Sequence, residues 1–87
     1  MSSILSLVLV KNNGIHTDNE VVNLAVYSDE SKCLEVIELL RNKSLEEVKE
    51  FFKSKDELAY NKINSSILNG RFPVSRFYFK SCKVNQH

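Results

Sequence analysis

Residue types that could support acid–base chemistry come together at one place in this sequence. His16, Asp18 and Glu20 share a polar stretch, so an imidazole and two carboxylates lie close along the chain. General acid–base catalysis needs such groups held within hydrogen-bond reach of a substrate, and a polar loop does not fix those distances. We therefore interpret His16 as a solvated loop residue and predict that the chain is not an enzyme. An enzyme built around this loop is the least favoured alternative.

Residue types that bind metals or cofactors do not occur at the required spacing. Cys33 and Cys82 are the only cysteines, and His16 and His87 do not complete a four-ligand zinc site with them. The glycine-rich phosphate-binding motifs and the motifs of serine and zinc hydrolases are absent from the sequence. The sequence therefore predicts no metal site and no cofactor.

The cysteines and the apolar runs also bear on location. Cys33 falls on an apolar helical stripe, where a free cysteine behaves as a small hydrophobic residue. No apolar run approaches the ~20 residues that cross a bilayer. The run Ile4–Val10 lacks a preceding basic residue and a following small-residue cleavage site, so it does not resemble a signal peptide. We expect a reduced, cytoplasmic protein without a membrane partner.

The element expected to organise the fold is a helix within Ser28–Lys43. Apolar residues recur there at the spacing of one helical face, namely Cys33, Leu34, Val36, Ile37 and Leu40. Polar residues fall on the opposite side. The apolar face predicts a helix that packs on the segments before and after it.

Two further helices are expected after the first. Ser44 to Glu47 has the sequence of a capping box, and Ser54 to Glu57 repeats it, which favours two short helices over one long one. The apolar sides are predicted to consist of Leu45, Val48, Phe51 and Phe52 in the second helix and Leu58, Ile63 and Ile67 in the third. Asn69-Gly70 would end the third helix with a left-handed residue.

Two strands are expected before the helices. Ile4–Val10 is nearly all apolar, as in a central strand, and Val21–Tyr27 is the next candidate. Pairing Val10 with Val21 would align Leu5, Leu7 and Leu9 with Val26, Leu24 and Val22 on one apolar face. Lys11–Glu20 would then be a ten-residue loop.

A last strand is predicted at Arg71–Val84, with Phe77 and Phe79 facing the helices. The chain is therefore expected to form a single α+β domain over residues 1–87, with residues 85–87 frayed. Its order would be β-β-α-α-α-β, and its three-stranded antiparallel sheet would have the first strand in the centre and the helices packed on one face.

Charge is distributed unevenly along the chain. All eleven acidic residues lie between Asp18 and Glu57, whereas Leu58–His87 contains five basic residues and no acid. Such a split bears on partners rather than on fold. Five carboxylates are expected on the outward faces of the first two helices, and we interpret them as a partner-binding surface: Glu35, Glu38, Glu46, Glu47 and Glu50.

The second face of the sheet offers another surface. If the helices cover one face, the other keeps Ile4, Val8, Val10, Val21, Ala25, Tyr27, Arg76, Tyr78 and Lys80. An apolar patch of that size on a small protein marks a contact, so this face predicts a surface for a second copy of the chain, as a homodimer, or for a different macromolecule, unless a helix wraps round it.

The predicted last strand also admits a nucleic-acid interpretation. Bases and aromatic residues that alternate on a sheet can neutralise phosphates and stack on nucleobases. The residues of this alternative interface are Arg71, Arg76, Tyr78, Lys80 and Lys83. The acidic helices would oppose it by repelling phosphates.

These patterns favour a small non-enzymatic protein-binding module. Its size, its lack of catalytic motifs and its charge split suit an inhibitor or modulator that occupies the surface of a partner protein. A phage-type inhibitor of a nucleic-acid-processing host complex would have this character. The alternative is a nucleic-acid-binding module that uses the basic and aromatic last strand.

Overall fold

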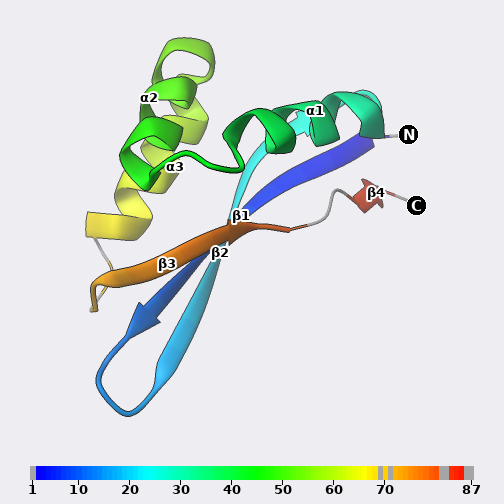
Figure 1. The fold of residues 1–87 in the computed structure, drawn as a ribbon. Helices are drawn as coiled ribbons and strands as arrows, with labels where there is room; N and C mark the ends of the chain where they lie inside the picture. Colours follow the sequence, from blue (N-terminus) through cyan, green and yellow to red (C-terminus); the bar gives the residue numbers. More distant parts are fainter. Residues whose placement is uncertain (1, 69, 71, 81–82, 86–87) are drawn as a thin grey trace.

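The computed structural model describes residues 2–68, 70, 72–80 and 83–85, which form an α+β fold (Figure 1). The strands are β1 (Ser2–Asn12), β2 (Thr17–Tyr27), β3 (Val74–Phe79) and β4 (Lys83–Asn85), and the helices are α1 (Glu30–Leu40), α2 (Leu45–Lys55) and α3 (Glu57–Leu68). The predicted order β-β-α-α-α-β is confirmed. The predicted last strand is divided into β3 and the short β4.

β1 is the central strand of the sheet. It pairs antiparallel with β2 along one edge and with β3 and β4 along the other. Leu5, Leu7 and Leu9 have no exposed surface, and Val8 and Val10 expose no more than 3%. A strand flanked on both edges is shielded by its neighbours, which explains its continuous apolar run. The predicted central position is confirmed.

The predicted register of the first hairpin is wrong. Val10 lies opposite Asn19, not Val21, and β1 and β2 continue to Asn12 and Thr17. The connection is therefore the short turn 13–16, in which Gly14 has a φ of 96°. The longer ladder pairs backbone groups that a ten-residue loop would leave to water. From Ser6 to Asn12 of β1, the observed pairing differs from the predicted pairing by two residues. A shift of two leaves each side chain on its predicted face of the sheet.

A bulge in β2 changes the faces further along the hairpin. The register shifts between Leu5 and Ser6, where Leu24 is the additional residue of β2. A bulge moves the following side chains to the other face. Ala25 and Tyr27 consequently pack against the core on the helical side, and Val26 is 66% exposed. The predicted placement of these three residues is thus wrong.

The starts of α1 and α2 follow from local side-chain caps. Asp29 accepts a hydrogen bond from the Lys32 amide at 2.9 Å, and this cap starts α1. The predicted capping box of α2 is confirmed, since the Ser44 hydroxyl accepts from the Glu47 amide at 3.2 Å and the Glu47 carboxylate accepts from the Ser44 amide at 3.0 Å.

The predicted ends of α3 are not observed. The second capping box does not form, because α2 continues through Ser54 and the Asp56 carboxylate instead caps α3 at the Ala59 amide, 3.3 Å away. Gly70 does not have a positive φ, so it is not the left-handed residue predicted after α3. Asn69 lies outside the described residues.

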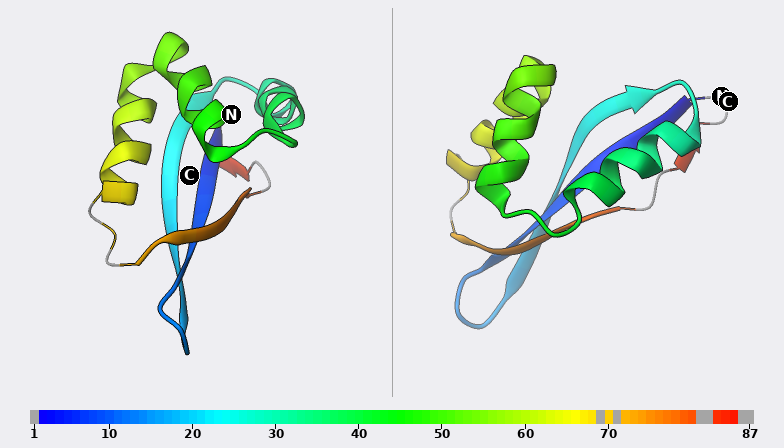
Figure 2. Two further views of the ribbon diagram at one scale, coloured as in Figure 1. Left: turned by 60° about the vertical axis from the view of Figure 1, so that its left-hand side comes forward. Right: turned by 45° about the horizontal axis from the view of Figure 1, so that its top comes forward.

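All three helices lie on the same side of the sheet, and α1 stands apart from the α2–α3 pair (Figure 2). The core between the layers contains Leu5, Leu7, Leu9, Val22, Leu24, Cys33, Leu40, Val48, Phe52, Ala59 and Ile63. Phe77 and Phe79 pack against it, as predicted. Leu34 and Leu58 are 47% and 66% exposed, against the prediction, because the helices turn these positions away from the sheet. The element to which all strands pair is β1, so α1 is not the organising element.

Cys33 is buried and disulfide-bonded. Its predicted role as a free thiol is therefore wrong. The other cysteine of the chain, Cys82, lies outside the described residues. Because disulfides persist mainly in oxidising compartments, this bond does not support the predicted cytoplasmic location. No helix among the described residues is long and apolar enough to span a bilayer.

Candidate functional site

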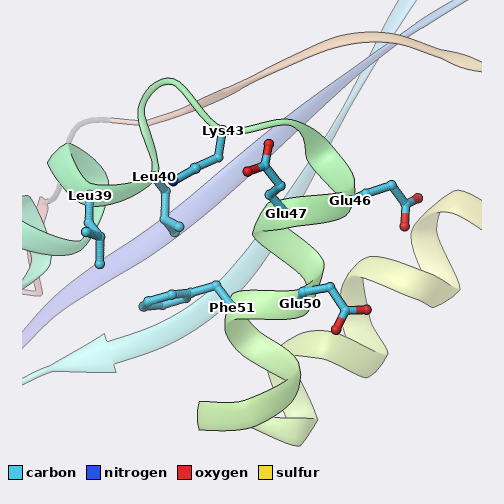
Figure 3. Close-up of a pocket in the computed structure, with 7 residues that line it drawn as sticks. All are labelled: Leu39, Leu40, Lys43, Glu46, Glu47, Glu50 and Phe51. Atoms are coloured by element: carbon cyan, nitrogen blue, oxygen red, sulfur yellow. The ribbon is translucent and has the colours of Figure 1, made fainter.

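A groove of about 500 Å³ lies between the end of α1 and the first turns of α2. Its lining consists of Leu39, Leu40, Lys43, Glu46, Glu47, Glu50 and Phe51. Figure 3 shows the Phe51 ring pointing from α2 toward α1, while Glu46 and Glu50 extend to the other side of α2. The groove thus has an apolar interior and carboxylates at its margin. We refer to it as the helical groove.

The apolar interior consists of residues that the core does not fully cover. Leu39 is 58% exposed, although its neighbour Leu40 is buried. Phe51 is partly buried and packs edge-to-face on Phe52, with the ring centroids 5.1 Å apart. A well-packed aromatic ring beside an exposed leucine provides a preformed contact for an apolar group.

The apolar surface continues onto β2. A second depression of about 450 Å³ shares Leu39 and Phe51 with the helical groove and adds Val26 and Tyr27. Val26 is 66% exposed because the bulge turns it away from the core. Burial raises the pKa of Tyr27, so its hydroxyl stays neutral here. The surface therefore extends from α2 across α1 to the sheet edge.

The margin is formed by Glu46, Glu47 and Glu50, which we call the carboxylate rim. The Ser44 amide donates to the Glu47 carboxylate and holds the pKa of Glu47 below its ordinary value. Glu46 is 78% exposed and lies 3.4 Å from Lys49, whose side chain is 16% exposed. Lys43 is the one cation in the groove lining. The rim carries more negative than positive charge.

The other two predicted partner-binding residues lie elsewhere. Glu35 and Glu38 are exposed on α1 and do not line the helical groove. Glu38 lies 3.4 Å from Arg41, its neighbour one helical turn on. The structure thus brings together three of the five predicted carboxylates. The sequence analysis did not identify Leu39, which, like Leu34, is an apolar residue of α1 that lies off the buried face.

The residues predicted for a nucleic-acid interface are only partly described. Arg76, Tyr78 and Lys80 are exposed, and Arg76 and Tyr78 lie opposite Val10 and Val8 in the ladder, on the face without helices. Arg71 lies outside the described residues. Lys83 belongs to β4, and only its backbone is described.

The loop around His16 does not assemble an acid–base site. The His16 amide donates to the Asn13 side chain, and Asp18 lies opposite Lys11 in the ladder. Glu20 binds Lys11, with Nζ and Oε1 2.6 Å apart. Among the described residues, no three His, Cys, Asp or Glu side chains lie close enough to hold a metal ion.

A buried lysine of β1 connects this strand with β2 and α3. Lys11 is 5% exposed, and its ammonium donates to Glu20 of β2 and, at 2.9 Å, to the Ser66 carbonyl of α3. The hydrogen bond from Lys11 and one from the Ser66 side chain lower the pKa of Glu20. The contact with Lys11 also explains how Glu20 can lie opposite the buried Leu9. We interpret this cluster as a structural tie.

Comparisons with known proteins give no relative: no protein-family model, curated protein or solved structure matches this chain.

Proposed function

We propose that this protein is a non-enzymatic module that binds another protein in the helical groove and acts as an inhibitor or modulator of that partner. The observation that carries the proposal is the exposed apolar contact of Leu39 and Phe51 beside the carboxylate rim. Small proteins rarely leave such a contact open without a use.

The charges of the rim define the chemistry of the partner. A partner with apolar side chains flanked by lysine or arginine would fill the interior and neutralise Glu46 and Glu50. Complementary charge of this kind speeds association and selects among partners. Basic surfaces of this kind occur on proteins that handle nucleic acids, which supports the proposal of a nucleic-acid-processing target. The proposal of protein binding does not depend on the predicted cytoplasmic location, which the disulfide at Cys33 does not support.

The second sheet face supports a separate proposal of self-association. Val21 and Tyr78 are 48% and 43% exposed and flank Val8 across the sheet. Two copies that meet through this face would cover both side chains. The apolar part of this face is smaller than the sequence predicted, because the bulge moves Ala25 and Tyr27 to the helical side.

Affinity capture with matched variants tests the main proposal. The wild type should capture a partner protein that neither Leu39→Ser nor Glu50→Lys captures. Once purified, this partner should bind each of the two variants at least tenfold more weakly than it binds the wild type. The controls are Leu68→Ser, since Leu68 is 81% exposed on α3, and Glu35→Lys, an equal charge reversal outside the groove. Equal loss in variant and control would contradict the proposal, as would unchanged binding by both groove variants.

A further inference from the structure

A second cleft, on a different side of α1, has the opposite charge. It lies between the last turn of α1 with the following loop and β3, and its volume is about 500 Å³. Arg41, Asn42 and Lys43 line it from the helix end and loop, and Phe77, Tyr78 and Phe79 line it from β3. We call it the β3 cleft.

The polar groups of the β3 cleft favour an anion. Among the described residues, two cationic side chains and one amide contribute to its lining and no carboxylate does. Arg41 lies 3.4 Å from Glu38, but both side chains are more than 60% exposed. An ion pair this exposed is worth little, so the Arg41 guanidinium can turn to another anion. Arginine is suited to phosphate because its planar group forms paired hydrogen bonds.

The β3 side of the cleft adds aromatic surface. Phe77 and Phe79 are partly exposed on the helical side of β3 and pack edge-to-face with centroids 6.2 Å apart, whereas Tyr78 lies opposite Val8 and alternates to the face without helices. In the described part of the sheet, β3 pairs with β1 alone, which leaves its outer edge open toward the cleft. Aromatic side chains at an accessible edge can stack on a planar ring, and such stacking is a main source of affinity for unpaired bases.

We propose that the β3 cleft binds a nucleotide unit, with its base against the aromatic residues of β3 and its phosphate on Arg41 and Lys43. This site shares Lys43 with the helical groove but otherwise has a different lining, and it goes beyond the proposed protein binding. Arg76 and Lys80 are exposed on either side of Tyr78 along the chain, so cationic groups continue beyond the cleft. A single strand would use them, whereas a free nucleotide would use the cleft alone.

Two probes distinguish these sources. Binding of a fluorescein-labelled octathymidylate is measured by anisotropy at several salt concentrations, and binding of ADP and UTP is measured by calorimetry. Binding of the oligonucleotide alone would identify a single-strand site, and binding of the mononucleotides at comparable affinity would identify a nucleotide site. Both results support the proposal. Absence of binding to every probe at 50 mM salt would overturn it.

Matched variants locate the site. The double variant Arg41→Ala/Lys43→Ala should weaken oligonucleotide binding at least tenfold and reduce the salt slope by roughly 0.7, since these two side chains share one phosphate and each phosphate contact contributes about 0.7. Lys32→Ala/Lys53→Ala removes the same charge from exposed positions outside the cleft and should change affinity less than twofold. Equal weakening by both pairs would show non-specific attraction and refute the site.

Phe79 provides the test of stacking. Phe79→Leu should weaken binding roughly five- to hundredfold, and Phe79→Tyr should retain it because the ring is kept. Unchanged binding in Phe79→Leu would overturn the placement of the base. A circular dichroism spectrum and melting temperature like those of the wild type confirm folding of each variant. Leu39→Ser should leave nucleotide binding unchanged, which separates this proposal from the protein-binding one.

Discussion

Replacement of Lys11 by methionine should destabilise the fold through a single buried ammonium. The side chain of Lys11 is 6% exposed and donates to Glu20 and to the Ser66 carbonyl. Gly70 leaves room for it, since a Cβ there would lie 2.5 Å from Nζ. Methionine keeps most of the apolar stem but makes neither hydrogen bond.

The size of the effect follows from what each partner loses. The Ser66 carbonyl loses its hydrogen-bond donor, and because Ser66 is only partly buried this costs no more than the value for a buried group, about 1–3 kcal/mol. Glu20 is 43% exposed and regains water, so loss of its ion pair adds no more than about 1 kcal/mol. We therefore expect Lys11→Met to lower the free energy of unfolding by about 1–4 kcal/mol at pH 7.

Urea unfolding of Lys11→Met, Glu20→Gln and the double variant measures this effect and the coupling. Because Lys11 and Glu20 interact directly, the double variant should lose at least about 0.5 kcal/mol less than the sum of the single variants. Additive losses, or a Lys11→Met variant as stable as the wild type, would refute the reasoning.

The same pair predicts a dependence on pH. The pKa of Glu20 is lowered from 4.5 in the folded protein, so its stabilising contribution is full above that value and is lost as the pH falls through the lowered pKa. The wild type should therefore lose stability in acid more steeply than Lys11→Met. An equal difference between the two proteins at pH 7 and pH 3 would contradict this assignment.

Three further outcomes are expected. Phe52→Ala should lower the free energy of unfolding in urea by about 3–5 kcal/mol, because Phe52 is 2% exposed. Leu58→Ala should change it by less than about 0.5 kcal/mol, because Leu58 is 66% exposed. Equal losses would contradict the core assignment. Ser44→Ala should cost about 1 kcal/mol and Ser44→Asp should recover most of it, since the side chain caps α2; a neutral Ser44→Ala would mean that the cap is dispensable. If the second sheet face forms a homodimer, light scattering should give twice the chain mass, with a melting temperature that rises with concentration, and Val21→Asp should give a monomer. A wild-type monomer over a hundredfold concentration range would exclude that dimer.

Sequence alone determined those features that depend on neighbouring residues or on burial pattern. The capping box at Ser44 and Glu47 is complete within four residues, so no distant contact is needed to form it. The apolar run of β1 required a position shielded on both edges, which only the centre of the sheet provides. The element order, the central strand and the inward side of Phe77 and Phe79 followed from such patterns.

Tertiary structure decided the features that join distant residues. The hairpin register depends on Lys11, which neutralises Glu20 and reaches α3, and this contact is not visible in the alternation of either strand. The bulge at Leu24 arises from the fit of β2 to β1 and the helices, and it alone exposes Val26.

The candidate site divides in the same way. The sequence identified Glu46, Glu47 and Glu50 as an outward face, because helical periodicity is local. It did not identify Leu39 as their apolar companion, nor Arg41 and Lys43 as neighbours of Tyr78. In the first case the end of α1 lies beside α2, which begins after a turn. In the second case it lies beside β3, which is distant in sequence. The path of that turn is fixed by packing on the sheet, and only the folded chain reveals it.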